Sequence, residues 1–349
     1  MTAAVTAERA APPSSVEELL ARSGQTALDL SGAGQSAWNG QVIETIGNVL
    51  GLAHWDGTLY LDSECILDPL RDMYQHAGEE QPVATLVRYR ESLATLLHEQ
   101  AHFLGPSGAT QEAARGAFTE PGSRQLEEGV AEAWAQDHLD EFLDRLGIDK
   151  VAPGIQDVQV GGYYPAFVPA IRVLTADLEA RGDLRSGELL DALNRQTAEG
   201  QLPLLVSVLY NSTRLPDLEP AGADTRHHLE AMLREGLTHL DSHELLPSGF
   251  AAARSRSTAG ALLTHLHTEI HARESDYSPH PSACDLSAPA PGPQSSTTTA
   301  RLIPHPMHTA LTGLAPPSPH RPPTVVHTPA QRIPSVGRTS APHRRQSVG

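Results

Sequence analysis

The chain has 349 residues, a net charge of −17, 28 prolines and two cysteines. This charge argues against a dedicated nucleic-acid or anionic-membrane binder, because such proteins carry a basic surface. The charge is unevenly distributed: residues 1–250 hold 16 basic and 38 acidic side chains, whereas residues 251–349 hold 9 and 4, with 15 of the prolines. The composition therefore predicts a folded domain over 15–250, a flexible N-terminus over 1–14 and a disordered tail over 251–349, rich in Pro, Ser, Thr, Arg and His.

Nothing in the sequence indicates a secreted or membrane-spanning protein. Its first residues lack the basic segment and apolar run of a secretory signal. The longest apolar stretch, residues 202–210, is far short of the ~20 residues that cross a bilayer. Cys65 and Cys284 lie on opposite sides of the change in composition, which argues against a disulfide framework. We therefore expect a cytoplasmic protein without a membrane or nucleic-acid partner.

Periodic patterns of apolar residues predict a fold of the α+β class, mostly α, with a small sheet. Alternating apolar and polar residues over 57–62, after an Asp56-Gly57 turn signal, predict a strand. A Gly-rich connection is expected between the two longest helices, the second of which ends at Gly147. The expected helices cover residues 16–24, 38–52, 83–104, 124–146, 168–181, 186–198 and 224–239.

The first long helix contains a His-Glu-x-x-His arrangement formed by His98, Glu99 and His102. Residues at i and i+4 lie on the same helix face, so both imidazoles can reach one metal ion. Glu99 adjoins the first histidine and can approach a metal-bound water. Because the metal lowers the pKa of that water toward neutrality, Glu99 can act as general base during attack on a carbonyl. The pattern predicts a hydrolase with Zn²⁺ as cofactor.

Two histidines leave zinc under-coordinated, so a third protein ligand is expected. The metzincin pattern requires a histidine six residues after His102, but Gly108 occupies that position. A nearby downstream histidine, His138, stands alone on an acidic helix. The remaining source is a carboxylate on the second long helix, where the segment Leu-Glu-Glu-Gly-Val-Ala-Glu-Ala-Trp offers Glu127, Glu128 and Glu132.

The order His98-Glu99-x-x-His102 followed by Glu128-Gly129-x-Ala131 resembles the gluzincin branch of the zincin metallopeptidases, over about residues 55–147. The resemblance implies a zincin-like fold in which His98, His102 and Glu128 are ligands and Glu99 is the general base. It also implies that the strand at 57–62 is the sheet edge along which an extended substrate lies. The 25 residues between His102 and Glu128 exceed the spacing of the best-known gluzincins. Glu127 and Glu132 therefore stay open as alternative ligands.

Further roles follow from the same segment. Glu132, one turn after Glu128, is expected to accept a hydrogen bond from a ligand histidine, as acids in this position often do in gluzincins. Glu127 is expected to be a solvated neighbour near the helix N-terminus.

The negative charge that develops on the substrate carbonyl calls for a Tyr or His donor. The candidates, with Tyr164 favoured, are Tyr163, Tyr164, Tyr210, His227 and His228.

The leading hypothesis is a zinc-dependent peptidase that hydrolyses peptide bonds in a peptide or protein substrate. An alternative is a catalytically quiet zincin-fold protein with a binding or regulatory role. A third reading is a metal hydrolase that acts on non-peptide amides.

Overall fold

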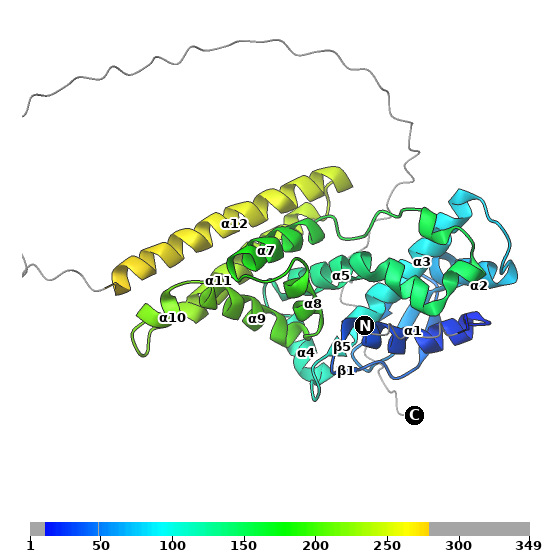
Figure 1. Ribbon diagram of the computed structural model, residues 1–349, viewed down its shortest axis with the longest axis horizontal. Coiled ribbons are helices and arrows are strands. Elements are labelled where there is room, and N and C mark those ends of the chain that lie inside the picture. Colours follow the sequence, from blue (N-terminus) through cyan, green and yellow to red (C-terminus); the bar gives the residue numbers. More distant parts are fainter. Residues whose placement is uncertain (1–10, 48, 279–349) are drawn as a thin grey trace, which may run out of the picture. The chain divides into compact units, whose positions relative to one another are not determined.

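The computed structural model describes residues 11–47 and 49–278. Over these residues the protein is mostly helical with two small sheets, which confirms the α+β, mostly α, class (Figure 1). None of the helices in this part of the chain is both long and apolar enough to span a membrane. Most of the predicted N-terminal segment, and the predicted tail from residue 279 onward, lie outside the described residues.

Helices, short helical turns and strands follow one another along the chain, and Figure 1 labels most of the helices. The helices are α1 Val16–Ser31, α2 Asp68–Gln75, α3 Val83–His102, α4 Gln111–Phe118, α5 Ser123–Leu146, α6 Ile148–Val151, α7 Val168–Arg181, α8 Glu188–Asn194, α9 Ala198–Asn211, α10 Leu215–Leu218, α11 Thr225–Thr238 and α12 Ser248–Tyr277. The short turns are η1 Ser63–Leu67, η2 Ile155–Asp157 and η3 His239–His243. The strands are β1 Gln35–Ser36, β2 Val42–Thr45, β3 Gly51–Ala53, β4 Leu59–Asp62 and β5 Leu104–Gly105.

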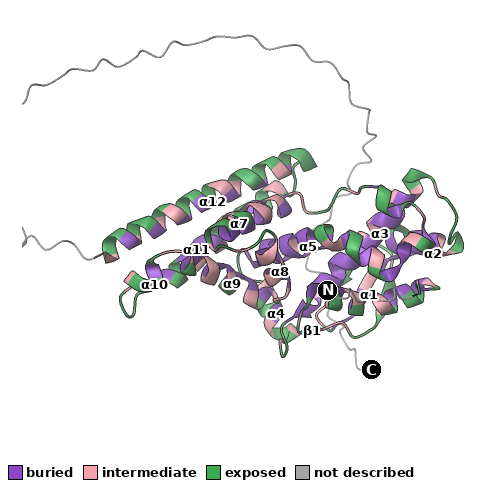
Figure 2. Cartoon of the chain, viewed as in Figure 1, coloured by how far each residue is buried: buried purple, intermediate pink, exposed green. Residues whose placement is uncertain are grey.

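The long helices α3 and α5 pack against each other and are buried along much of their length (Figure 2). Their bounds agree with the two long helices predicted from the sequence. Helix α3 ends before residue 104 because residues 104–105 form β5, which pairs with β1. Gly147 ends α5 in the left-handed conformation, at a φ of 69°, which glycine adopts without steric cost.

The three-stranded sheet has the order β2-β4-β3, with β4 parallel to β2 and antiparallel to β3. Leu59 and Leu61 of β4 are fully buried while Tyr60 faces the other side, which confirms the predicted strand. Because β4 is the central strand, it has no free edge. The expectation that this strand offers its edge to a substrate is therefore wrong, and the edge strand that contacts α3 is β3.

The helix predicted over 38–52 is also wrong, since this segment forms β2 and β3. The β-branched residues Val42, Ile43 and Thr45 favour extended backbone. Gly40, just before β2, has a φ of 83°, which an α-helix does not allow. Apolar spacing alone could not distinguish the two structures, because a short apolar run fits both periods.

The remaining predicted helices agree with the structure in their position along the chain but differ in their length. Helices α7, α8 and α11 correspond to the patterns near 168–181, 186–198 and 224–239, and α1 extends beyond residue 24 to Ser31. The connection between the long helices contains a helix that was not expected, α4. The side chain of Thr110 accepts a hydrogen bond from the Ala113 N–H and caps its start.

The predicted domain boundary near residue 250 is wrong, because α12 continues the folded domain to Tyr277. Its buried residues recur every three or four positions and so form one face, which packs mainly against α7 and α11. Several of them are alanine or serine, so the stripe is inconspicuous in a segment of this composition. They are Ala251, Ser255, Ala259, Leu262, Leu263, Leu266, Ile270 and Glu274.

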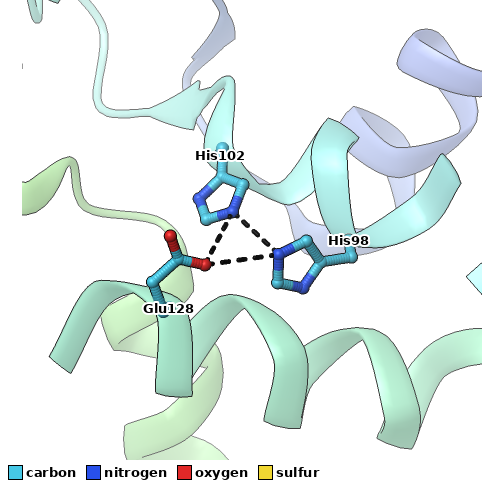
Figure 3. Close-up of side chains that lie close together, drawn as sticks. All are labelled: His98, His102 and Glu128. Atoms are coloured by element: carbon cyan, nitrogen blue, oxygen red, sulfur yellow. Dashed lines mark hydrogen bonds and ion pairs between the residues drawn. The ribbon is translucent and has the colours of Figure 1, made fainter. Parts of the chain in front are cut away.

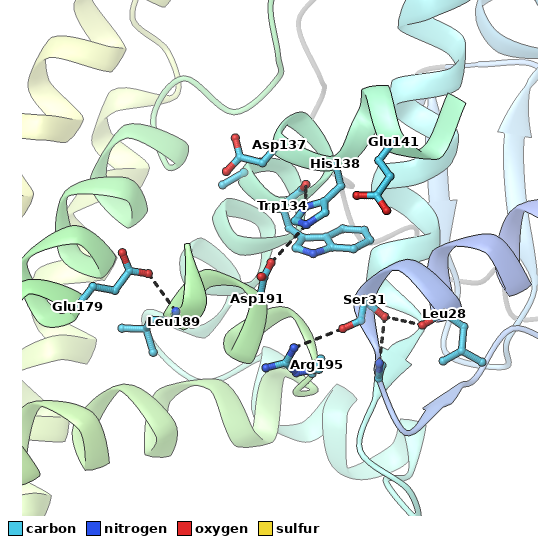
Figure 4. Close-up of polar contacts among 12 residues, drawn as sticks. Leu28, Ser31, Trp134, Asp137, His138, Glu141, Glu179, Leu189, Asp191 and Arg195 are labelled. Atoms are coloured by element: carbon cyan, nitrogen blue, oxygen red, sulfur yellow. Dashed lines mark hydrogen bonds and ion pairs between the residues drawn. The ribbon is translucent and has the colours of Figure 1, made fainter. Parts of the chain in front are cut away.

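Polar contacts attach α8 to its neighbours (Figure 4). The Nδ1 of His138 lies 2.9 Å from the Trp134 carbonyl oxygen, and its Nε2 lies 3.5 Å from Asp191 Oδ1. The buried carboxylate of Glu179 accepts the Leu189 N–H at 2.9 Å, at the start of α8. His138 therefore joins α5 to α8, which is a structural role.

Candidate metal centre

Three side chains from two helices converge between α3 and α5 (Figure 3). His98 and His102 come from successive turns of α3, and Glu128 comes from α5. The two Nε2 atoms lie 2.9 Å apart, and Glu128 Oε2 lies 3.5 Å from each. The structure thus brings together the three residues that the sequence and the resemblance indicated as ligands.

The separations fit a small cation. A point equidistant from the three atoms lies about 1.9 Å from each, close to the ~2.0–2.1 Å of zinc bonds to nitrogen and oxygen. Glu128 Oε2 is buried and only loosely satisfied, since both Nε2 atoms lie 3.5 Å away, and a buried carboxylate in this position is stabilised by a cation. Two imidazoles with one carboxylate are also a donor set of catalytic zinc. The residues present therefore fit Zn²⁺.

Two more carboxylates orient the imidazole rings. Glu132 Oε2 lies 2.9 Å from His98 Nδ1, and Glu127 Oε1 lies 2.5 Å from His102 Nδ1. When each Nδ1–H donates to its carboxylate, both Nε2 lone pairs are free for a metal. The Glu132 contact is the one predicted. The prediction of a solvated Glu127 is wrong, because this side chain is only 11% exposed and faces His102.

The centre gathers more carboxylates than imidazoles. Glu99, Glu127 and Glu132 are buried, and the Glu128 side chain is only 15% exposed. Burial lowers the pKa of His98, but the nearby carboxylates of Glu128 and Glu132 outweigh it and raise that pKa to about 9. Burial raises the pKa of the Glu128 carboxyl, but the two histidines outweigh it and hold that pKa well below its usual range. A divalent cation would balance the excess negative charge.

Glu99, the predicted general base, lies between the ligand triad and β3. Its Oε2 accepts the N–H of Ala53 at 2.7 Å. Gly51 leaves room for this carboxylate, because a Cβ there would lie 2.6 Å from both Cγ and Oε1 of Glu99. Burial raises the pKa of the Glu99 carboxyl. A carboxylate with a raised pKa is better suited to accept and return a proton near neutral pH.

The small residue after Glu128 allows two helices to approach closely. A Cβ on Gly129 would lie 2.5 Å from Ile171 Cγ1 and 3.3 Å from Phe167 Cβ, both at the start of α7. Helix α7 thereby supports the turn of α5 that presents Glu128 to the histidines.

The ring of Tyr164 lies against the ring of His98. The two rings stack with their centroids 5.6 Å apart. Tyr164 has a φ of 51°, a left-handed conformation that is unusual for a tyrosine and that occurs preferentially at functional sites. Burial and the charges of Glu128 and Glu99 raise the pKa of its hydroxyl. The hydroxyl therefore keeps its proton at neutral pH and can donate it in a hydrogen bond.

The residues before Tyr164 hold Glu132 in place. The Tyr163 N–H and the Gln136 side-chain amide both donate to Glu132 Oε1, each at 2.8 Å. Gly162 has no room for a side chain, because a Cβ there would overlap the Gln136 amide and lie 2.6 Å from Glu132 Oε1. The segment 162–164 thus contacts the centre twice, at Glu132 and at His98.

A cleft of about 210 Å³ opens onto the triad. Its lining includes the charged side chains Glu99, Glu127 and Glu128, the two histidines and Tyr164. Its other walls come from β3 with its flanking residues, the end of α3, and α4. They are Val49, Gly51, Leu52, Ala53, Trp55, Phe103, Gln111 and Phe118.

The other predicted donors and histidines lie away from this cleft. Tyr163 borders a separate hollow behind Glu132, and Tyr210 donates to Glu219. His227 is exposed on α11, and the neighbouring His228 pairs with Glu269. Tyr164 is the one candidate among the five that borders the cleft.

Comparison of this chain with family models, curated proteins and solved structures returns no match. The function of the centre must therefore be inferred from its own residues.

Proposed function

We propose that the protein is a zinc-dependent peptidase of the gluzincin type. The convergence of His98 Nε2, His102 Nε2 and Glu128 Oε2 on one point carries this proposal. These three atoms would hold the ion, which when bound supplies a Lewis acid that polarises a carbonyl and acidifies a coordinated water. The carboxylates of Glu127 and Glu132 support it, because an Nδ1–H that donates to each of them leaves both Nε2 atoms available to a metal.

Two further side chains have the placement that hydrolysis needs. Glu99 would accept the proton of the attacking water and deliver it to the leaving amine, as a general base and then a general acid. The hydrogen bond from Ala53 keeps its carboxylate beside the triad. The protonated hydroxyl of Tyr164 would donate to the carbonyl oxygen, where negative charge develops.

The edge of β3 favours a peptide over other amides. The bonds from Asp62 N–H to the Leu50 carbonyl and from His54 N–H to the Thr58 carbonyl set the register of β3 on β4. In an antiparallel pair the intervening residues direct their backbone groups outward, so Gly51 and Ala53 face away from β4. Glu99 takes the Ala53 N–H. The other backbone N–H and C=O groups of Gly51 and Ala53 can pair with an extended peptide by strand addition.

Hydrolysis of a mixed peptide library by the zinc-loaded wild type and by Glu99→Gln tests the proposal. The wild type should cleave peptide bonds, and Glu99→Gln should keep its zinc while kcat falls by roughly 10²–10⁴-fold, the usual contribution of a general base. A variant of Glu99 with full activity would exclude it as the base. A zinc-loaded wild type that cleaves no peptide would contradict the peptidase function and favour a binding or regulatory protein.

A further inference from the structure

We infer that the hollow behind Glu132 is a second ligand site, which binds a free amino acid with a small aliphatic side chain. The ammonium group of this ligand pairs with Glu91, and its carboxylate pairs with Arg90. The inference goes beyond the proposed peptidase function and does not depend on it, because none of the three candidate metal ligands borders this hollow.

The hollow lies between α3 and α5 and shares no lining residue with the cleft. Helix α3 contributes Arg90, Glu91 and Ala94, and α5 contributes residues between Glu132 and Leu139. Residues 159–163 and one residue of α7 complete its lining. Its volume of about 240 Å³ is below the ~300–1,000 Å³ of drug-sized ligand sites, so it suits a molecule of the size of one amino acid.

One carboxylate of the hollow lacks a partner. Asp137 is held by Arg172 at 2.7 Å, and Glu132 lies 2.9 Å from His98 Nδ1. The half-buried carboxylate of Glu91 makes no hydrogen bond or ion pair with any described residue, and burial alone raises its pKa. A cationic group in the hollow, beside Glu91, would stabilise the charged form of this carboxylate.

Arg90 supplies the complementary charge. Its side chain is only 6% exposed, its Nη1 donates to the Ile155 carbonyl at 3.1 Å, and its Nη2 pairs with Asp140. Its Nε is buried and has no acceptor in the part of the chain that the structure describes. A buried donor without an acceptor costs free energy, and a ligand carboxylate can accept this N–H. Gly161 and Gly162 also border the hollow, and neither backbone N–H donates to another described residue.

The rest of the lining indicates which zwitterion fits. Arg90 and Glu91 are neighbours in the chain, which suits a ligand that carries both charges on one carbon. An α-amino acid does so, whereas the two charged ends of a peptide lie further apart. The aliphatic side chains of the lining would pack against an aliphatic side chain of the ligand. They are Ala94, Ala135, Leu139 and Val160.

Glu132 connects the hollow to the metal centre. Its Oε1 accepts the Gln136 amide and the Tyr163 N–H, each at 2.8 Å, and both of these residues border the hollow. Its Oε2 faces His98. An occupant of the hollow therefore packs against the residues that hold the acid beside a candidate metal ligand.

Calorimetry with zinc-loaded protein tests the inference, with leucine as the probe. Isopentylamine is leucine without its carboxylate, and isocaproate is leucine without its ammonium group. Leucine should bind wild type with a Kd of about 1 mM or lower and at least about tenfold more tightly than either analogue, because each analogue lacks one charged partner.

Two variants show whether leucine binds in the hollow. Glu91→Gln removes the partner of the ammonium group, so leucine should bind about tenfold more weakly while isocaproate binds as before. Ala94→Leu fills the hollow from α3 and should abolish the binding of leucine. Glu64→Gln is the matched control, since Glu64 is exposed and does not border the hollow, and it should leave leucine binding unchanged.

No binding of leucine, equal binding of leucine and both analogues, or unchanged binding in Glu91→Gln and Ala94→Leu would overturn the inference. The peptidase proposal fails separately. Glu128→Ala lacks a candidate metal ligand but keeps the hollow, so it should bind leucine as wild type does. Wild type that binds leucine in the hollow but cleaves no peptide contradicts the peptidase function alone, whereas wild type that cleaves peptides but does not bind leucine contradicts the second site alone.

Discussion

Oε1 of Glu127 lies 2.5 Å from Nδ1 of His102, whereas Glu128 faces the other ring nitrogen, Nε2. Glu127 and Glu128 are neighbours in the chain, yet they approach the same imidazole at its two different nitrogens. Glu128 thus supplies a candidate ligand atom, and Glu127 orients the His102 ring that would bind the same metal. Glu132, one helical turn after Glu128, orients the ring of His98.

This relationship predicts that Glu127 contributes to metal affinity without touching the metal. Glu127→Ala removes the acceptor of the His102 Nδ1–H, and zinc affinity should fall by about 10–100-fold, as it does for comparable ligand-orienting acids. Titration against a competing chelator measures this change. Glu141→Ala, which removes an exposed acid of the same helix, serves as control. An unchanged affinity in Glu127→Ala would show that the contact does not orient His102.

A second prediction concerns the segment that holds Glu132. In Gly162→Ala the new methyl group must displace the Gln136 amide and crowd Glu132 Oε1, so we expect zinc affinity to fall by roughly tenfold. Gly161→Ala is the matched control, because a Cβ there meets no atom within 4 Å. The same chelator titration compares the two. Equal affinities in both variants would contradict a role for this segment in positioning Glu132.

A third prediction separates the base from the metal ligands. Gly51→Ala places a Cβ 2.6 Å from the Glu99 carboxylate and should displace the proposed base. A misplacement of this size lowers kcat by up to about 10²-fold, while the triad and its zinc content should stay unchanged. Gly249→Ala, at an exposed position with no atom within 4 Å of a new Cβ, should leave kcat as it is. Loss of zinc in Gly51→Ala would show that the effect is not confined to Glu99.

A fourth prediction tests whether α12 belongs to the folded domain. Leu266 is 1% exposed on its buried face, whereas Leu245, just before the helix, is 96% exposed. Leu266→Ala should lower the free energy of unfolding by about 2–5 kcal/mol, and Leu245→Ala should change it by no more than about 0.5 kcal/mol. Urea denaturation measures both. Equal stabilities would support the disorder that composition predicts from residue 251.

The sequence predicted those parts of the fold and site that depend on local spacing. The long helices and the strand at 57–62 follow from apolar periods, and the pairing of His98 with His102 follows from the rise of one helix. Glu128 was favoured by the resemblance and by the small Gly129, and the structure adds the close contact with Ile171 that requires a small residue there.

What the sequence missed depends on contacts between distant residues. The edge position of β3 is decided by its pairing with β4, and the Ala53–Glu99 bond joins residues 46 positions apart. Burial of Glu127 depends on the packing of α5 against α3, which a helix pattern does not report. The composition of residues 251–349 does not indicate helix α12, because the buried face of this helix consists partly of alanine and serine.

The zinc content of the purified protein, with and without Glu128, tests the central claim most directly. Elemental analysis after dialysis against metal-free buffer should find about one zinc per wild-type chain and per Glu141→Ala chain, and much less in Glu128→Ala, because a carboxylate ligand is lost and two histidines leave the ion under-coordinated. Wild type that retains no zinc after loading, or Glu128→Ala that retains as much as wild type, would contradict a metal centre formed by His98, His102 and Glu128.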